Sequence, residues 1–342
     1  MIHLQWQPIS TIEDAWARLQ TAIDIELGTI PPYLYAWLSI LPGKNAAAAA
    51  RIQSVFLEEM IHLCLACNIL NALGGNPVLT PPVYPGPLGD IGSDGKPLIV
   101  HLLRFSREAM QQGMNIETPE NPIEFPVRRT PAAEGPPPMV TIGQFYGALD
   151  RFLATLPPEA WNRERNQIDD SQFFPGQIHA VNDYEQARDA IERIVSEGEG
   201  ARRSPLDFKH ELAHYYRFHE CDSDLCLTKA DNPDGYQWGP QRLGIDWSAV
   251  YPAIPDPGTH DFSGDPPAAQ AAQAMCNDAY ARLIDALQLA VTGGAGQLGI
   301  AVRAMFNLRA AAHLALTTPL ADPQLVAGPS FLYRPVPTGA ST

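Results

Sequence analysis

Two short stretches of the chain place a glutamate and a histidine three residues apart within apolar sequence. Glu59 and His62 lie in RIQSVFLEEMIHLCLACNILNAL, and Glu211 and His214 lie in HELAHYYRF. If both stretches are helical, the two side chains of each pair share one helix face, with Cβ atoms about 5–6 Å apart. A buried carboxylate is costly unless it is paired or bound to a metal ion. The two pairs therefore predict a metal site.

Two further glutamates extend this pattern to a full ligand set. Glu26 occupies a core position on the apolar seam of the first predicted helix, and Glu199 in IVSEGEG ends a later one. Glu197, Glu192 and Glu185 on the same helix are alternatives to Glu199. The order Glu, Glu-x-x-His, Glu, Glu-x-x-His is typical of ferritin-like four-helix bundles that hold two metal ions. The sequence thus predicts six metal ligands: Glu26, Glu59, His62, Glu199, Glu211 and His214.

The types of these ligands indicate which metal they would bind. Four carboxylates balance the charge of two divalent cations, and one histidine per metal leaves coordination positions open. Oxygen-rich ligation favours two iron ions, with manganese as the alternative, over structural zinc. A single Glu-x-x-His more often lies on a solvated helix face, so the prediction depends on finding two. Glu58, one position off the seam, is expected to be dispensable.

The remaining sequence shows which elements must position these ligands. Residues 11–73 predict a helical hairpin, with a helix break at Pro31-Pro32 and Thr29 as N-cap of the next segment. The Pro- and Gly-rich stretch 74–140 predicts a long crossover whose short helix, near 106–112, packs outside the bundle. Helices are expected again within 141–225, the last over DFKHELAHYYRFHECDSDL. The fold class is therefore all-α: a ferritin-like bundle over 1–225, with a helical extension over 226–342 packed on it.

The extension and several side chains carry further expectations. Apolar periodicity predicts helices at about 267–292 and 298–316. Cys64 and Cys67 read as inert core thiols rather than a redox pair. His210 and His219 are expected to be solvated or to orient a ligand. Four tyrosines near the ligands are candidates to line a pocket: Tyr33, Tyr35, Tyr215 and Tyr216.

Bulk properties restrict the partners. The formal charge of −15 argues against nucleic acid and anionic membrane surfaces. Five cysteines, and an N-terminal stretch that does not look like a signal peptide, favour reduced thiols and a cytoplasmic location. The expected partners are a small-molecule substrate and dioxygen, with a homo-oligomer left open.

Several motifs resemble one family, the ferritin-like domain of iminophenylpyruvate dimer synthases from violacein and rebeccamycin biosynthesis. They are ELGTIPPYLYAWLSI, EEMIHLCLACNILNALGGNP, YPGPL, IGQFY, EGEG and ELAHYYRFHE, spread over roughly residues 20–225. The resemblance implies the bundle, its metal site and the choice of Glu199, the glutamate of the -GEG- motif. Glu197 stands where the family often has glutamine, so it remains an alternative ligand.

Two functions follow as hypotheses. The first is a non-haem di-iron oxidase or oxygenase of a small organic substrate, such as one derived from an aromatic amino acid. The second is a non-catalytic ferritin-like module in which the metal stabilises the bundle. Iron storage is less favoured, because the crossover and the C-terminal block would obstruct packing into a cage.

Overall fold

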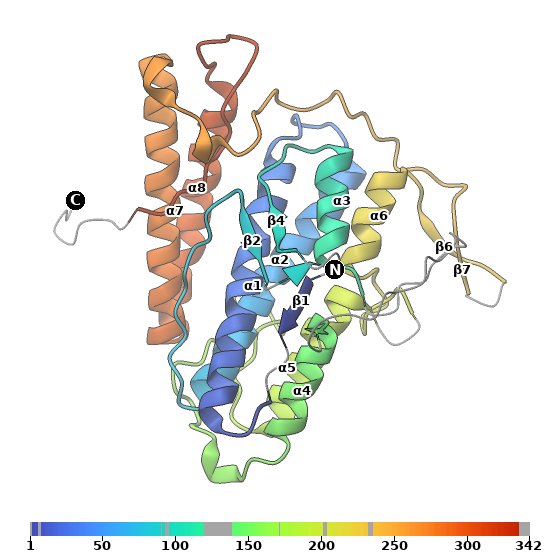
Figure 1. The fold of residues 1–342 in the computed structure, drawn as a ribbon, viewed down its shortest axis with the longest axis vertical. Helices are drawn as coiled ribbons and strands as arrows, with labels where there is room; N and C mark the ends of the chain where they lie inside the picture. The colour runs from blue at the N-terminus through green and yellow to red at the C-terminus, as the bar shows by residue number, and fades with distance from the viewer. Residues whose placement is uncertain are drawn as a thin grey trace.

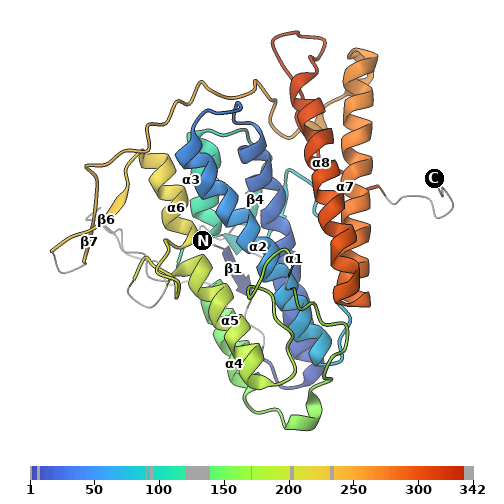
Figure 2. The same ribbon diagram turned by 180° about the vertical axis from the view of Figure 1, so that it is seen from behind.

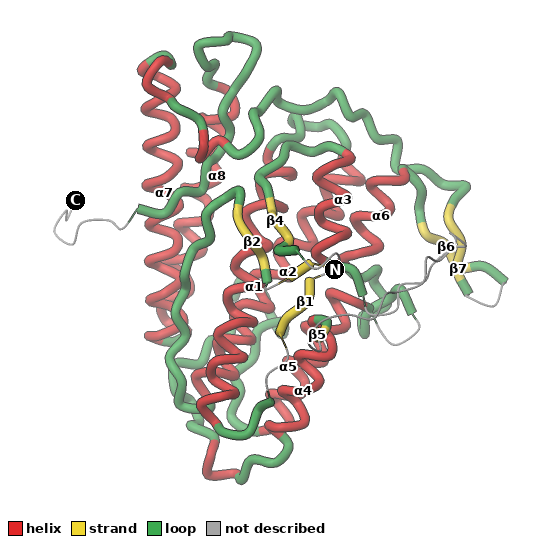
Figure 3. The backbone as a smooth tube through the Cα atoms, in the orientation of Figure 1, coloured by secondary structure: helices red, strands yellow, loops and turns green. Residues whose placement is uncertain are grey.

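Helices make up most of the computed structural model, which describes residues 2–5, 8–89, 91–92, 96–119, 139–170, 172–200, 204–231 and 235–334. The helices of these residues are α1 (Ile12–Leu38), α2 (Ala46–Ala72), α3 (Arg107–Ile116), α4 (Ile142–Leu153), α5 (Tyr184–Glu199), α6 (His214–Ser223), α7 (Pro267–Gly293) and α8 (Leu298–Thr317). Strands are few and short (Figure 3). This confirms the all-α prediction.

A four-helix bundle is built around α1 and α2, which form a long antiparallel hairpin (Figure 1). Two short helices fill each of the other two bundle positions. In both views α3 and α6 lie in the upper half and α4 and α5 in the lower half (Figures 1 and 2). The helices α3 and α4 contact α1, whereas α5 and α6 contact α2. Both short-helix positions are thus interrupted part-way along the bundle.

Helix α1 continues through Pro31 and Pro32, so the predicted helix break is wrong. A proline inside a helix leaves the carbonyl four residues earlier without its usual donor. For Pro32 that carbonyl belongs to Gly28, and the Tyr84 hydroxyl donates to it at 2.6 Å. Thr29 lies within the helix and does not cap a new one. A partner from outside the helix therefore takes over one of the two missing hydrogen bonds.

The short helix of the crossover belongs to the bundle, whereas the sequence analysis placed it outside. Helix α3 packs closely on α6, since a Cβ on Gly113 would come within 2.9 Å of the Phe218 ring. Both Phe218 and the α3 residue Met110 are buried. The crossover therefore supplies one of the interior helices, and residues 120–138 within it lie outside the described part of the chain.

Short antiparallel strands fasten the loops around the bundle. Strand β1 (Ile2–Gln5) pairs with β3 (Ile91–Gly92) and β5 (Met139–Val140), with Ile2 opposite Gly92 and Leu4 opposite Val140. Two separate ribbons join β2 (Gly86–Leu88) to β4 (Leu98–Val100) and β6 (Leu227–Lys229) to β7 (Tyr236–Trp238). These pairs connect the N-terminus to the crossover and close the loops around it.

Helices α7 and α8 form a second hairpin beside α1 and α2 (Figures 1 and 2), at the predicted positions. Their apolar residues join one continuous core with those of the bundle. The buried Tyr35 hydroxyl on α1 contacts the carbonyl oxygens of Ile254, at 2.5 Å, and Ala327, at 3.0 Å. Whether residues 226–342 unfold together with residues 1–225 stays a prediction.

One helix of the described residues, α2, is long and apolar enough to cross a membrane. Its most apolar window is 89% buried inside the protein, as expected for the central helix of a bundle. Cys64 and Cys67 lie on this helix, and all five cysteines of the chain are free and buried. Burial raises the pKa of Cys64 to about 12, which agrees with the interpretation as core thiols.

Candidate metal centre

Two groups of acidic and histidine side chains meet inside the bundle and share one member. Glu26, Glu59 and His62 form the first group, and Glu59, Glu117 and His214 form the second. Within each group the potential ligand atoms lie within 4.8 Å of one another. All five side chains are buried or nearly so. This geometry suits two metal ions that share the carboxylate of Glu59.

Both imidazoles turn the same nitrogen toward the carboxylates. His62 Nδ1 is 3.6 Å from Glu26 Oε2 and 3.8 Å from Glu59 Oε1. His214 Nδ1 is 2.8 Å from Glu59 Oε1 and 3.6 Å from Glu117 Oε2. The two rings are 5.6 Å apart and nearly parallel. Nδ1 is therefore the potential metal ligand of each histidine.

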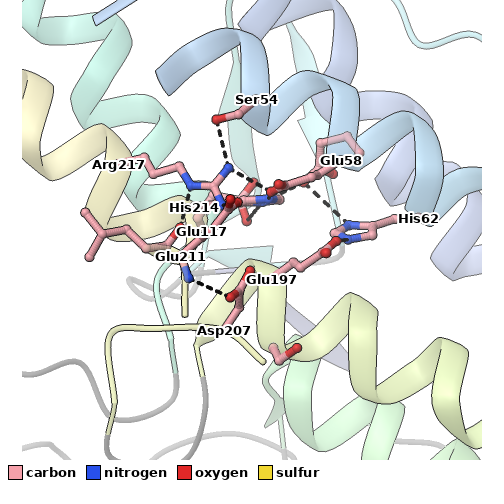
Figure 4. A network of polar contacts seen from close by, with 12 residues as sticks. Ser54, Glu58, His62, Glu117, Glu197, Asp207, Glu211, His214 and Arg217 are labelled. Carbon is pink, nitrogen blue, oxygen red and sulfur yellow. Dashed lines mark hydrogen bonds and ion pairs between the residues drawn. The ribbon is translucent and has the colours of Figure 1, made fainter. Parts of the chain in front are cut away.

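The opposite nitrogen of each histidine meets a buried carboxylate (Figure 4). His62 Nε2 is 2.8 Å from Glu197 Oε2, and His214 Nε2 is 2.9 Å from Glu58 Oε2. The pKa values of Glu197 and Glu58 are lowered, because contacts with the histidines outweigh the opposing effect of burial. Both acids are thus ionised acceptors for an Nε2–H donor. A carboxylate behind a metal-ligating imidazole fixes its tautomer and orientation.

Basic side chains hold these two outer carboxylates in turn. Lys209 Nζ is 2.6 Å and Arg193 Nη2 is 3.1 Å from Glu197 Oε1. Arg217 Nη1 donates to Glu58 Oε2 at 2.8 Å and to Ser54 Oγ at 2.8 Å (Figure 4). A buried charge needs such partners to offset its desolvation. The two halves of the site thus repeat one arrangement: a basic group, a carboxylate, an imidazole and the central cluster.

Each of the three cluster carboxylates also accepts a hydrogen bond from a buried or partly buried hydroxyl group. The pairs are Tyr146 to Glu26 Oε1 at 2.8 Å, Thr29 to Glu59 Oε2 at 2.8 Å and Tyr33 to Glu117 Oε1 at 2.5 Å. Tyr33 therefore touches the cluster as expected. Tyr35 contacts the C-terminal block, and Tyr215 and Tyr216 pack edge to face on α6.

The pKa values show that the cluster holds extra protons when no cation is present. Burial, followed by the charges of Glu117 and Glu26, raises the pKa of Glu59 to about 8. Burial would lower the pKa of His62, but its contacts with Glu197 and Glu26 raise it to about 10. The pKa of His214 is also raised well above its usual value. Divalent cations can replace these protons, so the cluster is electrostatically suited to metal.

The donors also pass a geometric test for metal. His214 Nδ1 is fully buried and makes no hydrogen bond of acceptable geometry, although Glu59 Oε1 is 2.8 Å away. Two ligands of one metal ion also face each other at such a distance without a hydrogen bond, so His214 Nδ1 and Glu59 Oε1 fit this role. Glutamate oxygen and imidazole nitrogen also form a donor set that suits iron or manganese.

A small cavity adjoins the cluster. Its volume is about 30 Å³, and its lining includes Glu26, Glu59, His62 and Glu117. The rest of its wall comes from α1, α3, α4, α5 and the segment after α3, with Thr118, Ile142 and Gly198 among these residues. This volume admits about two water-sized molecules. The cavity is too small for an aromatic substrate in the conformation described.

The structure brings together four of the six ligands predicted from the sequence: Glu26, Glu59, His62 and His214. Glu211 is not among them, since its side chain is 59% exposed and lies 3.6 Å from Arg217. The helix predicted across this pair begins only at His214. Before it, Asp207 Oδ1 accepts hydrogen bonds from the backbone amides of Lys209 and Glu211, which forms a turn. The helical spacing assumed for Glu211 is therefore wrong.

The third-helix glutamate needs a similar revision. Glu199 is the last residue of α5, and its side chain lies outside what the structure describes, so its role as a ligand stays a prediction. Glu197, the alternative, is fully buried and contacts His62. Glu192 points to solvent and pairs with Arg188. His210 is exposed, and His219 stacks on Tyr215 and meets Trp238 edge-on; neither histidine belongs to the two groups.

Two residues of the site were missed in the sequence. Glu117 follows α3 directly, and the spacing Met110, Gly113, Glu117 continues the buried face of that helix. This three-four spacing in the sequence could have identified Glu117 as a buried residue. Glu58 was judged dispensable, but it is buried against His214 and Arg217. A side chain one position off a seam can still be buried where a second helix crosses.

The bundle and its paired ligand groups define a ferritin-like protein. A family model described as ferritin-like matches residues 19–223, and the chain belongs to this family. Dichlorochromopyrrolate synthase of Lentzea aerocolonigenes is 25% identical over an alignment that covers 95% of this chain. The alignment spans only 36% of the length of that relative. A ferritin-like protein from Caulobacter vibrioides has the same fold, with a TM-score of 0.64, 24% identity, and coverage of 96% of this chain and 100% of the other.

Proposed function

We propose that this protein is a non-haem di-iron oxidoreductase that oxidises a small organic substrate with dioxygen. The observation that supports this most directly is the pair of three-residue groups that share Glu59. The likeness to a synthase supports a biosynthetic reaction, and the motifs that resemble iminophenylpyruvate dimer synthases favour an aromatic substrate derived from an amino acid. Manganese is the alternative metal, because it suits the same ligands.

The residues of the chain would hold the metal as follows. Glu26 and His62 would hold one ion and Glu117 and His214 the other, with Glu59 common to both groups. When bound, two Fe(II) ions would supply electrons for the activation of dioxygen. Glu197 and Glu58 keep the protons of the two imidazoles on Nε2 and leave Nδ1 free to coordinate. Tyr33, Tyr146 and Thr29 fix the carboxylate orientations.

The buried setting determines what can reach the cluster. The 30 Å³ cavity admits dioxygen and excludes bulk water, which limits side reactions. A larger substrate has to approach from the outer wall at Thr118, Ile142 and Gly198. Widening of this wall is the conformational step that an oxidase would need.

Anaerobic titration with Fe(II) tests the proposal. The wild type is expected to bind about two ions per chain and to develop near-ultraviolet ferric absorption in air. Glu59→Ala should lose both responses, because it removes the shared ligand. Glu192→Gln is the matched control on the solvent side of α5 and should retain both. Equal metal binding by wild type and Glu59→Ala would contradict the proposal.

The small cavity favours a second candidate, a metal-stabilised module without catalysis. In that case iron would bind and raise the melting temperature, but a fully loaded sample would not respond to oxygen. The same titration therefore separates the two functions.

A further inference from the structure

A second, larger cavity lies between the α1–α2 hairpin and the α7–α8 hairpin. Its volume is about 310 Å³, and a narrower cavity of about 50 Å³ adjoins it along the same interface. Pro31, Met60, Tyr280 and Met305 line both cavities. This size falls within the range of small-molecule sites. No lining residue is shared with the cavity beside the metal cluster.

The walls of this pocket are almost entirely apolar, and many are aromatic. Trp37 and Phe56 come from the bundle, Phe174 from the loop before α5, and Phe306 from α8. Phe306 is 66% exposed, so it lies at the open end of the pocket. Aromatic walls of this kind bury the apolar body of a ligand and stack against its rings.

One polar group inside the pocket lacks a partner. The Tyr280 side chain is 3% exposed, and its hydroxyl group has no hydrogen-bond partner among the described residues. Burial raises the pKa of Tyr280, so the hydroxyl keeps its proton and remains a donor. A buried donor without an acceptor destabilises a protein, and buried tyrosine hydroxyls usually have a partner. An acceptor atom of a bound molecule would satisfy it.

A positive charge lies at the rim of the pocket. Arg309 is exposed, lines the pocket, and lies over the Trp37 ring at 5.0 Å from the ring centre. No salt bridge joins Arg309 to an acidic group of the described residues. The stacking holds the guanidinium group at the rim, where an anion can be paired without being taken fully out of water.

We propose that this pocket binds a small apolar organic anion. The anionic group pairs with Arg309 near solvent, the apolar body fills the space between the hairpins, and a neutral acceptor atom takes the Tyr280 hydrogen bond. The charge stays at the rim because burying it without a partner is costly. This inference does not depend on the metal cluster or on the proposed oxidation.

Fluorescence titration with 1-anilinonaphthalene-8-sulfonate, an aromatic anion, tests the proposal on the metal-free full chain. One saturable site is expected. Arg309→Gln should weaken binding about tenfold, whereas Arg303→Gln, on the exposed face of the same helix and outside the pocket, should not. Val302→Trp should abolish binding by filling the cavity. If Val302→Trp does not fold, Arg309→Gln alone tests the proposal, because Arg309 is exposed and its substitution should not disturb the fold.

Competition identifies which kind of anion the pocket accepts. Displacement of the probe by naphthalene-2-carboxylate indicates an aromatic acid, and displacement by decanoate alone indicates an acyl chain. Displacement by neither compound overturns the proposal, as does probe binding that Arg309→Gln leaves unchanged.

Tyr280→Phe provides a readout that a merely structural role would not give. Loss of an unpaired buried hydroxyl should keep or raise the melting temperature of the ligand-free protein. The same variant should bind 6-methoxynaphthalene-2-carboxylate, whose ether oxygen can accept the hydrogen bond, several-fold more weakly than the wild type does, whereas its affinity for naphthalene-2-carboxylate, which has no such acceptor, should be unchanged. A lower melting temperature with unchanged affinity would show that Tyr280 serves packing alone, and would refute its assignment as a ligand-binding group.

Discussion

Glu117→Gln is expected to weaken metal binding and Glu211→Gln is not, although the sequence pattern predicted Glu211 as the ligand. Glu117→Gln removes a charged donor from the group formed with Glu59 and His214. Its amide oxygen can still accept the Tyr33 hydrogen bond, so the fold should survive. Loss of a residue that only orients a ligand costs about 10–100-fold in metal affinity. Loss of the ligand itself should cost at least about 100-fold, or ~2.7 kcal/mol.

Only one of the two ions should be affected, because Glu26 and His62 remain intact. In an anaerobic titration against a competing chelator, Glu117→Gln should retain about one tightly bound Fe(II) per chain. Glu211→Gln should retain both, since its side chain is 59% exposed and outside the cluster. Its effect on the free energy of unfolding should stay within about 0.5 kcal/mol. Loss of an ion in Glu211→Gln but not in Glu117→Gln would refute the assignment.

Three further outcomes follow from the contacts of the site and of α1. Glu58→Gln should lower the affinity for the ion near His214 about tenfold, and Glu197→Gln should lower the affinity for the ion near His62 by a similar factor, because each variant removes a charged acceptor at Nε2. Calorimetric titration resolves the two binding steps. Equal effects of either variant on both ions would argue against separate roles. The pKa of Glu59 is raised to about 8 and that of His62 to about 10 in the fold, so their contributions to metal-free stability are present at low pH and are lost as the pH rises through those values. The melting temperature of the metal-free protein should therefore decrease as the pH is raised from 6 to 10, while the stabilisation by added Fe(II) or Mn(II) increases. A metal-free protein that gains stability over this range would contradict the assignment. Tyr35→Phe should lower the free energy of unfolding by about 1–3 kcal/mol, because the single hydroxyl proton shared by the carbonyl oxygens of Ile254 and Ala327 is lost. Chemical denaturation measures this, and an unchanged midpoint would show that water replaces the hydroxyl.

The sequence predicted the parts of the site that lie on long regular helices. Glu26, Glu59 and His62 belong to α1 and α2, where a three-four apolar spacing identifies the buried face. His214 also lies in the cluster, although the helix assumed for it begins only at this residue. Helical periodicity is thus a sound guide where the helix is long.

The errors arose where helices are short or end at the site. Glu211 was assigned by the spacing of a helix that begins three residues later, after a turn organised by Asp207. Glu117 follows a ten-residue helix inside a Pro-rich stretch, where periodicity has too few turns to be recognised. Pro31 and Pro32 do not end α1 as predicted, because the hydroxyl of Tyr84 replaces a missing helical donor at the carbonyl of Gly28, 56 residues away in the sequence. Such long-range partners cannot be read from local sequence.

The helix interruptions place the partial charges of helix ends at the cluster. Helix α3 ends at Ile116, directly before Glu117, and α5 ends at Glu199, two residues after the buried Glu197. The carbonyl ends of both helices therefore lie beside the cluster, where their dipoles add partial negative charge. The beginning of α6 at His214 places a helix N-terminus beside Glu58, where the opposite end of a dipole stabilises an anion that must stay ionised. Continuous helices would have placed their ends far from the site, so the broken second half of the bundle brings the C-terminal ends of α3 and α5 to the cluster and the N-terminal end of α6 to the outer carboxylate of Glu58, which it keeps charged.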